Sequence, residues 1–116
     1  MYLEEIRDYC LSKKGTEETF PFDQTTLVFK VFGKMYALID VDEARSINLK
    51  CDPERAEELR EQYEGIIPGY HMSKKHWNTV LLDGSINRSL VMELIDHSYD
   101  LVYASLPKKL RNELEN

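Results

Sequence analysis

The most suggestive chemistry in this sequence is the run Lys74-Lys75-His76-Trp77. Lysine ammonium groups contact phosphates as point charges, and an aromatic ring can stack on a base or cover a sugar. The run lies within residues 65–82, which contain no aspartate and no glutamate. This acid-free segment is therefore the natural place for an anion-binding site. The alternative interpretation is that Trp77 anchors the core while the lysines merely solvate a loop.

Other residues could extend this segment into a basic surface. His71 belongs to the same loop, Lys34 falls at an expected hairpin tip, and Lys50 falls on the polar face of an expected strand. The sequence does not fix where these side chains lie relative to Lys74. The candidate nucleic-acid-binding residues are Lys34, Lys50, His71, Lys74, Lys75, His76 and Trp77.

The charge of the whole chain opposes such a role. The net charge is −6, from 21 acidic residues against 15 lysines and arginines. Residues 1–64 hold 15 acids and 9 bases, whereas residues 65–116 hold 6 of each. An acidic protein is repelled overall by nucleic acid and by anionic membranes. Any anion binding must therefore be local.

The sequence offers no catalytic or metal motif. Glycine-rich phosphate loops, HExxH, CxxC and GxSxG are all absent. His97, Ser98 and Asp100 are close in sequence but point in different directions on a helix, so they predict no triad. Cys10 and Cys51 are expected to be buried thiols. We therefore expect a protein that is not an enzyme, with no catalytic residues and no cofactor.

Two groups of possible metal ligands were weighed. His71 and His76 could share a metal with Asp83, but their separation is not a recognised ligand spacing. The acidic stretch at residues 40–43 lacks the twelve-residue loop of a calcium-binding hand. The sequence therefore predicts no metal site.

Hydrophobic periodicity predicts the elements that position these residues. Amphipathic stripes and caps predict helices, and alternation predicts strands. Gly33-Lys34 is expected to form a two-residue type II′ turn between the first two strands. The expected helices are residues 2–13, 52–65, 85–106 and 108–114; the expected strands are 26–32, 35–41, 45–51 and 76–82; residues 16–25 and 65–75 are expected to be loops.

The resulting order, α-β-β-β-α-β-α-α, predicts an α+β fold. We expect a two-layer sandwich in which an antiparallel sheet of about four strands carries helices on one face. The 116 residues suit one domain spanning 1–116. No apolar run is long enough for a membrane span, and the acids among residues 1–14 do not suit a signal peptide. A cytoplasmic protein without a membrane partner is expected.

Several longer motifs resemble the MmcQ/YjbR family. They are the runs Ile47-Asn-Leu-Lys-Cys-Asp-Pro-Glu-Arg-Ala56 and Gly69-Tyr-His-Met-Ser-Lys-Lys-His-Trp-Asn-Thr79, the tail at residues 94–102 and 106–109, and Phe20-Pro-Phe22. The resemblance covers essentially the whole chain in the expected order. It implies a single MmcQ/YjbR-like domain over residues 1–116.

The resemblance also implies a function. Members are small bacterial cytosolic proteins with a two-layer α+β fold similar to CyaY-like sheets, and they are described as DNA-binding through two hairpin wings. In this chain one wing would be the hairpin around Phe32, Gly33 and Lys34, and the distinctive polar stretch would be residues 71–77. DNA binding is therefore the first expectation for function.

Two other functions stay open at this point. The alternating strands leave a sheet face or edge for a protein partner, as in an interaction or adaptor domain. The His/Lys/Trp loop could instead bind a small anion in a pocket. Monomer and homodimer are both open.

Overall fold

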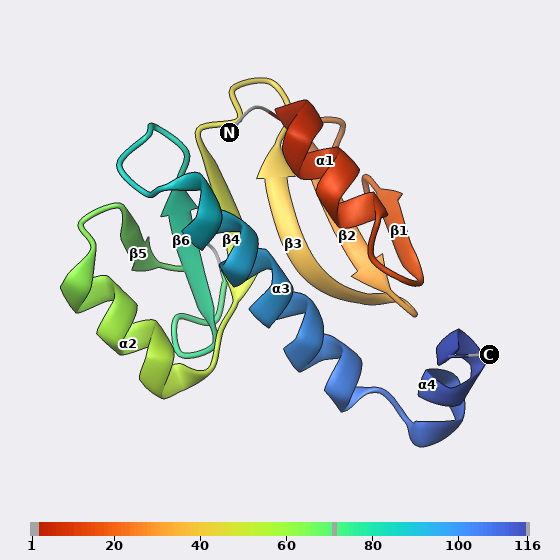
Figure 1. Ribbon diagram of the computed structural model, residues 1–116. Coiled ribbons are helices and arrows are strands. Elements are labelled where there is room, and N and C mark those ends of the chain that lie inside the picture. Colours follow the sequence, from red (N-terminus) through yellow and green to blue (C-terminus); the bar gives the residue numbers. More distant parts are fainter. Residues whose placement is uncertain (1–2, 71, 116) are drawn as a thin grey trace.

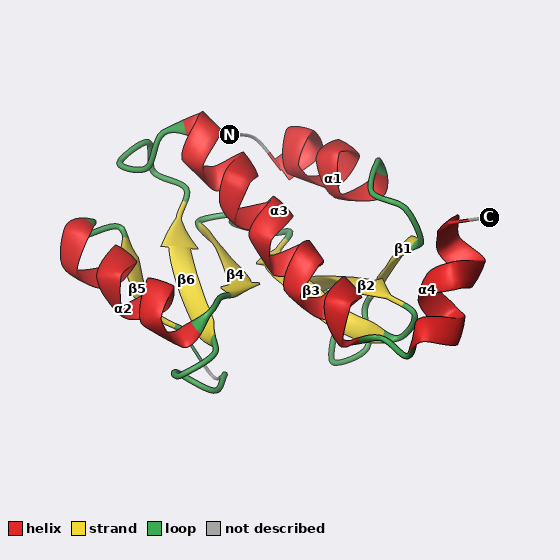
Figure 2. Cartoon of the chain, turned by 60° about the horizontal axis from the view of Figure 1, so that its bottom comes forward, coloured by secondary structure: helices red, strands yellow, loops and turns green. Residues whose placement is uncertain are grey.

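An antiparallel sheet forms one layer of the molecule, and helices form the other (Figures 1 and 2). The computed structural model describes residues 3–70 and 72–115. Within them the elements are α1 (Leu3–Leu11), β1 (Thr16–Thr19), β2 (Thr26–Val31), β3 (Lys34–Asp40), β4 (Ser46–Lys50), α2 (Pro53–Gln62), β5 (Ile66–Pro68), β6 (Trp77–Leu81), α3 (Arg88–Ser105) and α4 (Lys108–Glu115).

The sheet order is β1-β2-β3-β4-β6-β5, with every neighbouring pair antiparallel. α1 and α3 lie across one face of this sheet, and α2 lies beside β5 (Figure 1). Alternate strand residues bury their apolar side chains under α3, where they meet its apolar stripe. The core includes Leu27, Phe29, Ile39, Ile47, Leu49, Leu94, Ile95 and Val102. The predicted α+β class is therefore confirmed.

The sheet has six strands within the described residues, and the prediction of about four was too low. β1 and β5 are the additional strands, and both lie in segments expected to be loops. β1 reads Thr-Glu-Glu-Thr and has no apolar alternation, so only its pairing with β2 makes it a strand. β5 is three residues long and ends in Pro68, which an edge strand tolerates because proline lacks an N–H donor.

The β2–β3 turn lies one residue earlier than predicted. β2 ends at Val31 and β3 begins at Lys34, so Phe32 and Gly33 are the central residues. Their φ angles are 46° and 77°. Two positive φ values define a type I′ turn, and the expected type II′ turn at Gly33-Lys34 is wrong. The register also shifts between Phe29 and Lys30, a local irregularity that alternation alone does not reveal.

The helix starts follow capping chemistry. Asp52 caps α2 as predicted, its carboxylate accepting from the Arg55 N–H at 3.2 Å. α3 begins later than expected, because Asn87 rather than Ser85 caps it and accepts from the Leu90 N–H at 2.8 Å. In the part of the chain that the structure describes, no helix combines the length and apolarity needed to cross a bilayer.

Candidate functional site

Strand pairing gathers the predicted cations at one end of the sheet. Lys34 begins β3, Lys50 ends β4 and Trp77 begins β6, and Lys50 is the direct partner of Trp77. Neighbouring strands lie about 5 Å apart, so the starts of β3 and β6 are separated by about 10 Å. We call this end the basic rim, and its members are Lys30, Lys34, Lys50, Lys74 and Lys75.

The opposite end of the same sheet is acidic. Thr26 at the start of β2 pairs with Asp40 at the end of β3, and β6 ends shortly before Asp83. The acidic residues of this end are Asp23, Asp40, Asp42, Glu43 and Asp83. Lys34 and Asp40 are the two ends of β3 and lie six residue steps apart, which is about 20 Å. The screening length at physiological salt is about 8 Å, so these acids scarcely weaken the field at the basic rim.

The lysines of the basic rim are not neutralised by ion pairs. Lys34, Lys74 and Lys75 are exposed, and Lys30 and Lys50 are half-buried. Across residues 3–70 and 72–115, no ion pair joins any of these five lysines to a carboxylate. Other cations are paired, namely Arg7, Lys13, Arg45, Arg55 and Arg88. Two of the five have other neighbours, because Lys34 Nζ donates to Ser105 Oγ at 3.4 Å and Lys30 has Glu17 as its direct partner on β1.

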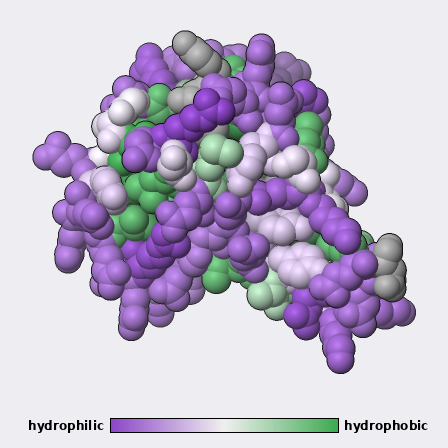
Figure 3. Space-filling model, viewed as in Figure 1, coloured by the Kyte–Doolittle hydropathy of each residue, from purple (hydrophilic) through white to green (hydrophobic). Residues whose placement is uncertain are grey.

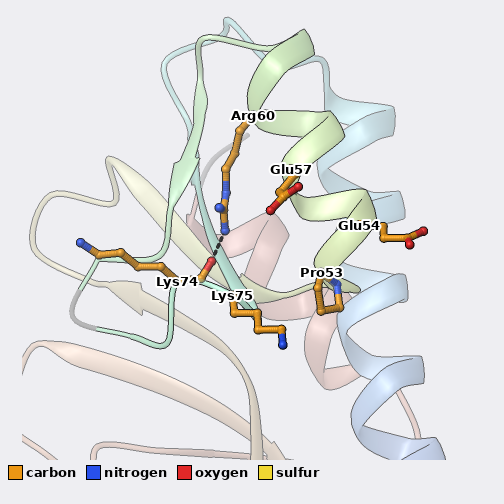
Figure 4. A pocket seen from close by; sticks show the side chains of 6 residues that line it. All are labelled: Pro53, Glu54, Glu57, Arg60, Lys74 and Lys75. Carbon is orange, nitrogen blue, oxygen red and sulfur yellow. Dashed lines mark hydrogen bonds between the residues drawn. The ribbon is translucent and has the colours of Figure 1, made fainter.

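Arg60 on α2 holds the loop that carries Lys74 and Lys75. Its Nη2 donates to the carbonyl of Lys74 (Figure 4). Its Nε donates to Asn78 Oδ1 at 2.6 Å, and Nη2 also donates to the Trp77 carbonyl at 3.3 Å. Asn78 is buried and donates in turn to the Ala56 carbonyl at 3.4 Å. The sequence analysis missed Arg60. Its place one turn after the buried Ala56 was the available signal.

The two loop lysines point in different directions. Figure 4 shows Lys74 extending away from α2 and Lys75 extending toward Pro53. A pocket of about 370 Å³ separates α2 from the loop and is lined by Pro53, Glu54, Glu57, Arg60, Lys74 and Lys75. Carboxylates in this lining repel an anion, and neither His76 nor Trp77 belongs to it. This arrangement does not favour the small-anion interpretation.

Trp77 belongs to a small apolar cluster. Its side chain is 8% exposed and packs with Val28 and Leu38, separately from the main core. The ring is therefore not available as a stacking surface, and the structure favours the alternative that Trp77 is a core anchor. Gly69 is required beneath it, because a Cβ there would lie 2.7 Å from Trp77 Cβ and 2.9 Å from its carbonyl oxygen.

The histidines do not assemble a metal site in the described residues. His71 lies outside those residues. His76 is exposed, and its carbonyl accepts from the Cys51 N–H at 2.8 Å. His76 and Asp83 flank opposite ends of β6, more than about 20 Å apart, so they cannot share a metal. In residues 3–70 and 72–115 no three histidine, cysteine or acidic side chains form a possible metal cluster.

His97 and Ser98 serve the fold in separate directions. Ser98 is buried; its Oγ donates to the Tyr36 carbonyl at 2.5 Å and accepts from the Lys50 N–H at 2.9 Å. His97 Nε2 accepts from the Asp52 N–H at 3.2 Å. Burial lowers the pKa of His97, and the nearby Arg55 lowers it further. This geometry does not bring a base to the serine hydroxyl.

The predicted thiols are buried. Cys10 and Cys51 are both free cysteines in the core. Burial raises the pKa of Cys10 to about 12 and also raises that of Cys51. Since the thiolate is the reactive form, neither cysteine is set up as a nucleophile.

Known proteins resemble the chain over nearly its whole length. The YjbR family model matches residues 11–101. The YjbR protein of Escherichia coli K12 is 36% identical over 115 residues, which cover 98% of each chain. YyaQ of Bacillus subtilis is 29% identical over 113 residues, covering 84% of this chain and 95% of its own.

Solved structures share the fold. The crystal structure of Deinococcus radiodurans protein DR2400 superposes with a TM-score of 0.91 at 46% identity, over 97% of this chain and 87% of that one. A crystal structure of a Pseudomonas syringae protein gives a TM-score of 0.74 at 32% identity, over 88% of this chain and 99% of that one.

Proposed function

The chain belongs to the YjbR family, and we propose that it is a DNA-binding protein whose basic rim contacts the phosphates of the DNA backbone. The observation that carries this proposal is the convergence of Lys34, Lys50 and Lys74 at one end of the sheet. No carboxylate of the described residues forms an ion pair with them. We propose a binding role rather than catalysis.

The separation of charge along the sheet supports binding of a polyanion by an acidic protein, and the acids that remain near the rim include Glu17 opposite Lys30 and Glu54 and Glu57 beside Lys75. The acidic end lies about 20 Å away, which is more than two screening lengths at physiological salt. Binding then depends on the local field of the rim rather than on the net charge of −6. At low salt the screening length grows, so repulsion from the acidic end offsets part of the gain in affinity.

Phosphate contacts position a protein on DNA but carry no sequence information. Trp77 is buried, so it does not add base recognition to the loop. We therefore expect affinity in the range of nonspecific binding, with a Kd of roughly 1 to 100 μM at physiological salt. The affinity should fall as salt rises, because each lysine that contacts a phosphate releases counterions.

The other two functions have less support. The pocket beside Lys75 contains Glu54 and Glu57, which disfavour a small anion. The helix-covered face is mainly hydrophilic, with only smaller hydrophobic patches (Figure 3). This face does not present the large apolar patch that marks a protein interface, so a protein partner would have to use another surface, such as the one with the exposed Ile67 and Tyr70.

The test is fluorescence anisotropy with a labelled DNA oligonucleotide at about 50 and about 200 mM salt. The double variant Lys34→Ala/Lys74→Ala removes two rim charges. Arg45→Ala/Arg88→Ala is the matched control, because it removes two exposed cations from the acidic end and changes net charge equally. We expect the rim variant to lose about tenfold in affinity at low salt and the salt slope to fall by about 2.

The affinity of the control variant for DNA should be closer to that of the wild-type protein than the affinity of the rim variant is. Equal losses in the two double variants would show that only net charge matters. Absence of binding by the wild-type protein at about 50 mM salt, to single strands and duplexes alike, would refute the proposal.

A further inference from the structure

An exposed aromatic side chain occupies a strained position at the tip of the β2–β3 hairpin. Phe32 has a φ of 46° and is 39% exposed. The first central position of a type I′ turn favours asparagine, aspartate or glycine, because other side chains crowd their own backbone at positive φ. A phenylalanine there costs backbone energy and leaves apolar surface in water.

The fold does not explain this choice of residue. Phe32 belongs to neither of the two apolar clusters of the structure. A Cβ added at the adjacent Gly33 would have no atom within 4 Å, so the tip projects into open space. Strained, exposed residues that the core does not use are candidates for function.

One cation follows Phe32 by two residues: Lys34 is exposed, and its Nζ donates to Ser105 Oγ at 3.4 Å. Lys30 precedes Phe32 by two residues and has Glu17 as its direct partner on β1. Residues two apart lie within about 7 Å along the backbone, so the Lys34 backbone lies close to the ring. An exposed aromatic face beside a basic groove is an arrangement by which proteins hold single-stranded nucleic acid.

We propose that Phe32 stacks on an unpaired base, and that the DNA held by the basic rim is single-stranded. The inference rests on the proposed function and adds the class of DNA. Bases in a duplex already stack on one another, so a ring at a hairpin tip reaches their faces only by unstacking them. Bases of a single strand expose their faces, and stacking on them tolerates any sequence.

The substitution Phe32→Asn separates binding from folding. Asparagine suits the first position of a type I′ turn, so this variant removes the ring and relieves the backbone. We expect a higher Tm than that of the wild-type protein. Affinity for an oligothymidine should fall about tenfold, because stacking on one base contributes about that much.

Two comparisons make the test specific. A duplex of the same length should bind Phe32→Asn within about twofold of the wild-type protein, since its bases are not stacked on the ring. Phe22→Asn is the control, because Phe22 is 64% exposed but precedes β2, at the acidic end. This control should leave single-strand affinity unchanged. A 2-aminopurine base in the oligonucleotide should lose fluorescence on binding the wild-type protein, but not on binding Phe32→Asn.

The outcomes of these experiments distinguish failure of the stacking role from failure of the proposed DNA-binding function. If the wild-type protein binds no DNA, the proposed function fails. If it binds and the rim variant weakens binding, but Phe32→Asn keeps the wild-type affinity for the single strand, only the stacking role is overturned. A lower Tm for Phe32→Asn would show that the ring serves the fold. A dimer that becomes a monomer on this substitution would assign the ring to a protein interface instead.

Discussion

Arg60 and Asn78 are joined by a hydrogen bond of 2.6 Å from the guanidinium Nε to the amide Oδ1. The bond connects α2 to β6, and the same guanidinium donates to the carbonyls of Lys74 and Trp77. The loop that presents Lys74 is therefore held by a residue fourteen positions earlier in the chain. This contact therefore positions a residue of the proposed binding surface and also joins two elements of the fold.

Arg60→Ala should destabilise the protein by about 2 kcal/mol, because it leaves the buried Asn78 oxygen and two carbonyls without a charged donor. Arg60→Lys should keep only part of the stability that Arg60→Ala loses, since an ammonium group cannot reproduce the planar fork of a guanidinium. Urea unfolding measures both. Arg45→Ala removes an exposed ion pair and should cost less than about 0.5 kcal/mol. Equal costs at the two sites would contradict the assigned role of Arg60.

Lys74→Ala should weaken DNA binding more than Lys75→Ala, although both remove one charge. Lys74 extends away from α2, whereas Lys75 extends toward Pro53 in a pocket shared with Glu54 and Glu57 (Figure 4). Anisotropy titrations at several salt concentrations should show a loss of slope of about 1 for Lys74→Ala and less for Lys75→Ala.

The pocket beside Lys75 also offers a variant that should bind more tightly. Glu54→Gln/Glu57→Gln removes the two carboxylates that line this pocket and should strengthen DNA binding. Identical effects of the two lysine substitutions would show that the direction of the side chains is irrelevant.

Ser98→Ala should destabilise the protein by about 2 kcal/mol or more. The hydroxyl bridges β3 and β4, accepting from the Lys50 N–H and donating to the Tyr36 carbonyl, and both groups would lose their partner. Ser105 on the same helix is the matched control, because within the described residues its exposed hydroxyl joins no two strands. It donates to the Val102 carbonyl and accepts from the Lys34 ammonium group, so Ser105→Ala should cost less than Ser98→Ala. Thermal and urea unfolding that fail to separate the two variants would disprove the bridging role.

Stability should fall as pH is lowered from about 7.5 to about 5.5, and His97 should supply part of the loss. Its pKa in the folded protein is lowered, so the unfolded chain takes up the proton first as pH falls. The contribution is complete above the unfolded pKa of about 6.5 and disappears as pH falls through the folded value. His97→Gln should flatten the pH dependence of the unfolding free energy over this range. An unchanged pH profile would rule out this contribution.

Local patterns were enough to predict the helices and the central three-strand meander, and the resemblance of longer motifs identified the family. Asp52 capped its helix as expected because a cap depends on neighbours in sequence. β1 escaped prediction because Thr16–Thr19 has no apolar alternation and owes its conformation to β2. The hairpin turn was misplaced by one residue because Phe32 at positive φ contradicts its intrinsic preference.

For the lysines of the basic rim, the sequence likewise shows some features and only the tertiary structure shows others. Their residue types and the acid-free segment around Lys74 were evident from the sequence. That Lys34 and Lys50 share an end of the sheet with Lys74 follows from antiparallel register, which joins residues far apart in the chain. The burial of Trp77 and the clamp by Arg60 likewise required packing between elements.

The sequence by itself determined the four helices, the central strands and the charges that are present, since propensity, capping and alternation act over a few residues. Only the tertiary structure decided which charges lie together, which aromatic ring is buried and which is left exposed at a hairpin tip. Those outcomes depend on strand register and on contacts between distant segments, and a change of one residue in register moves a side chain to the opposite face.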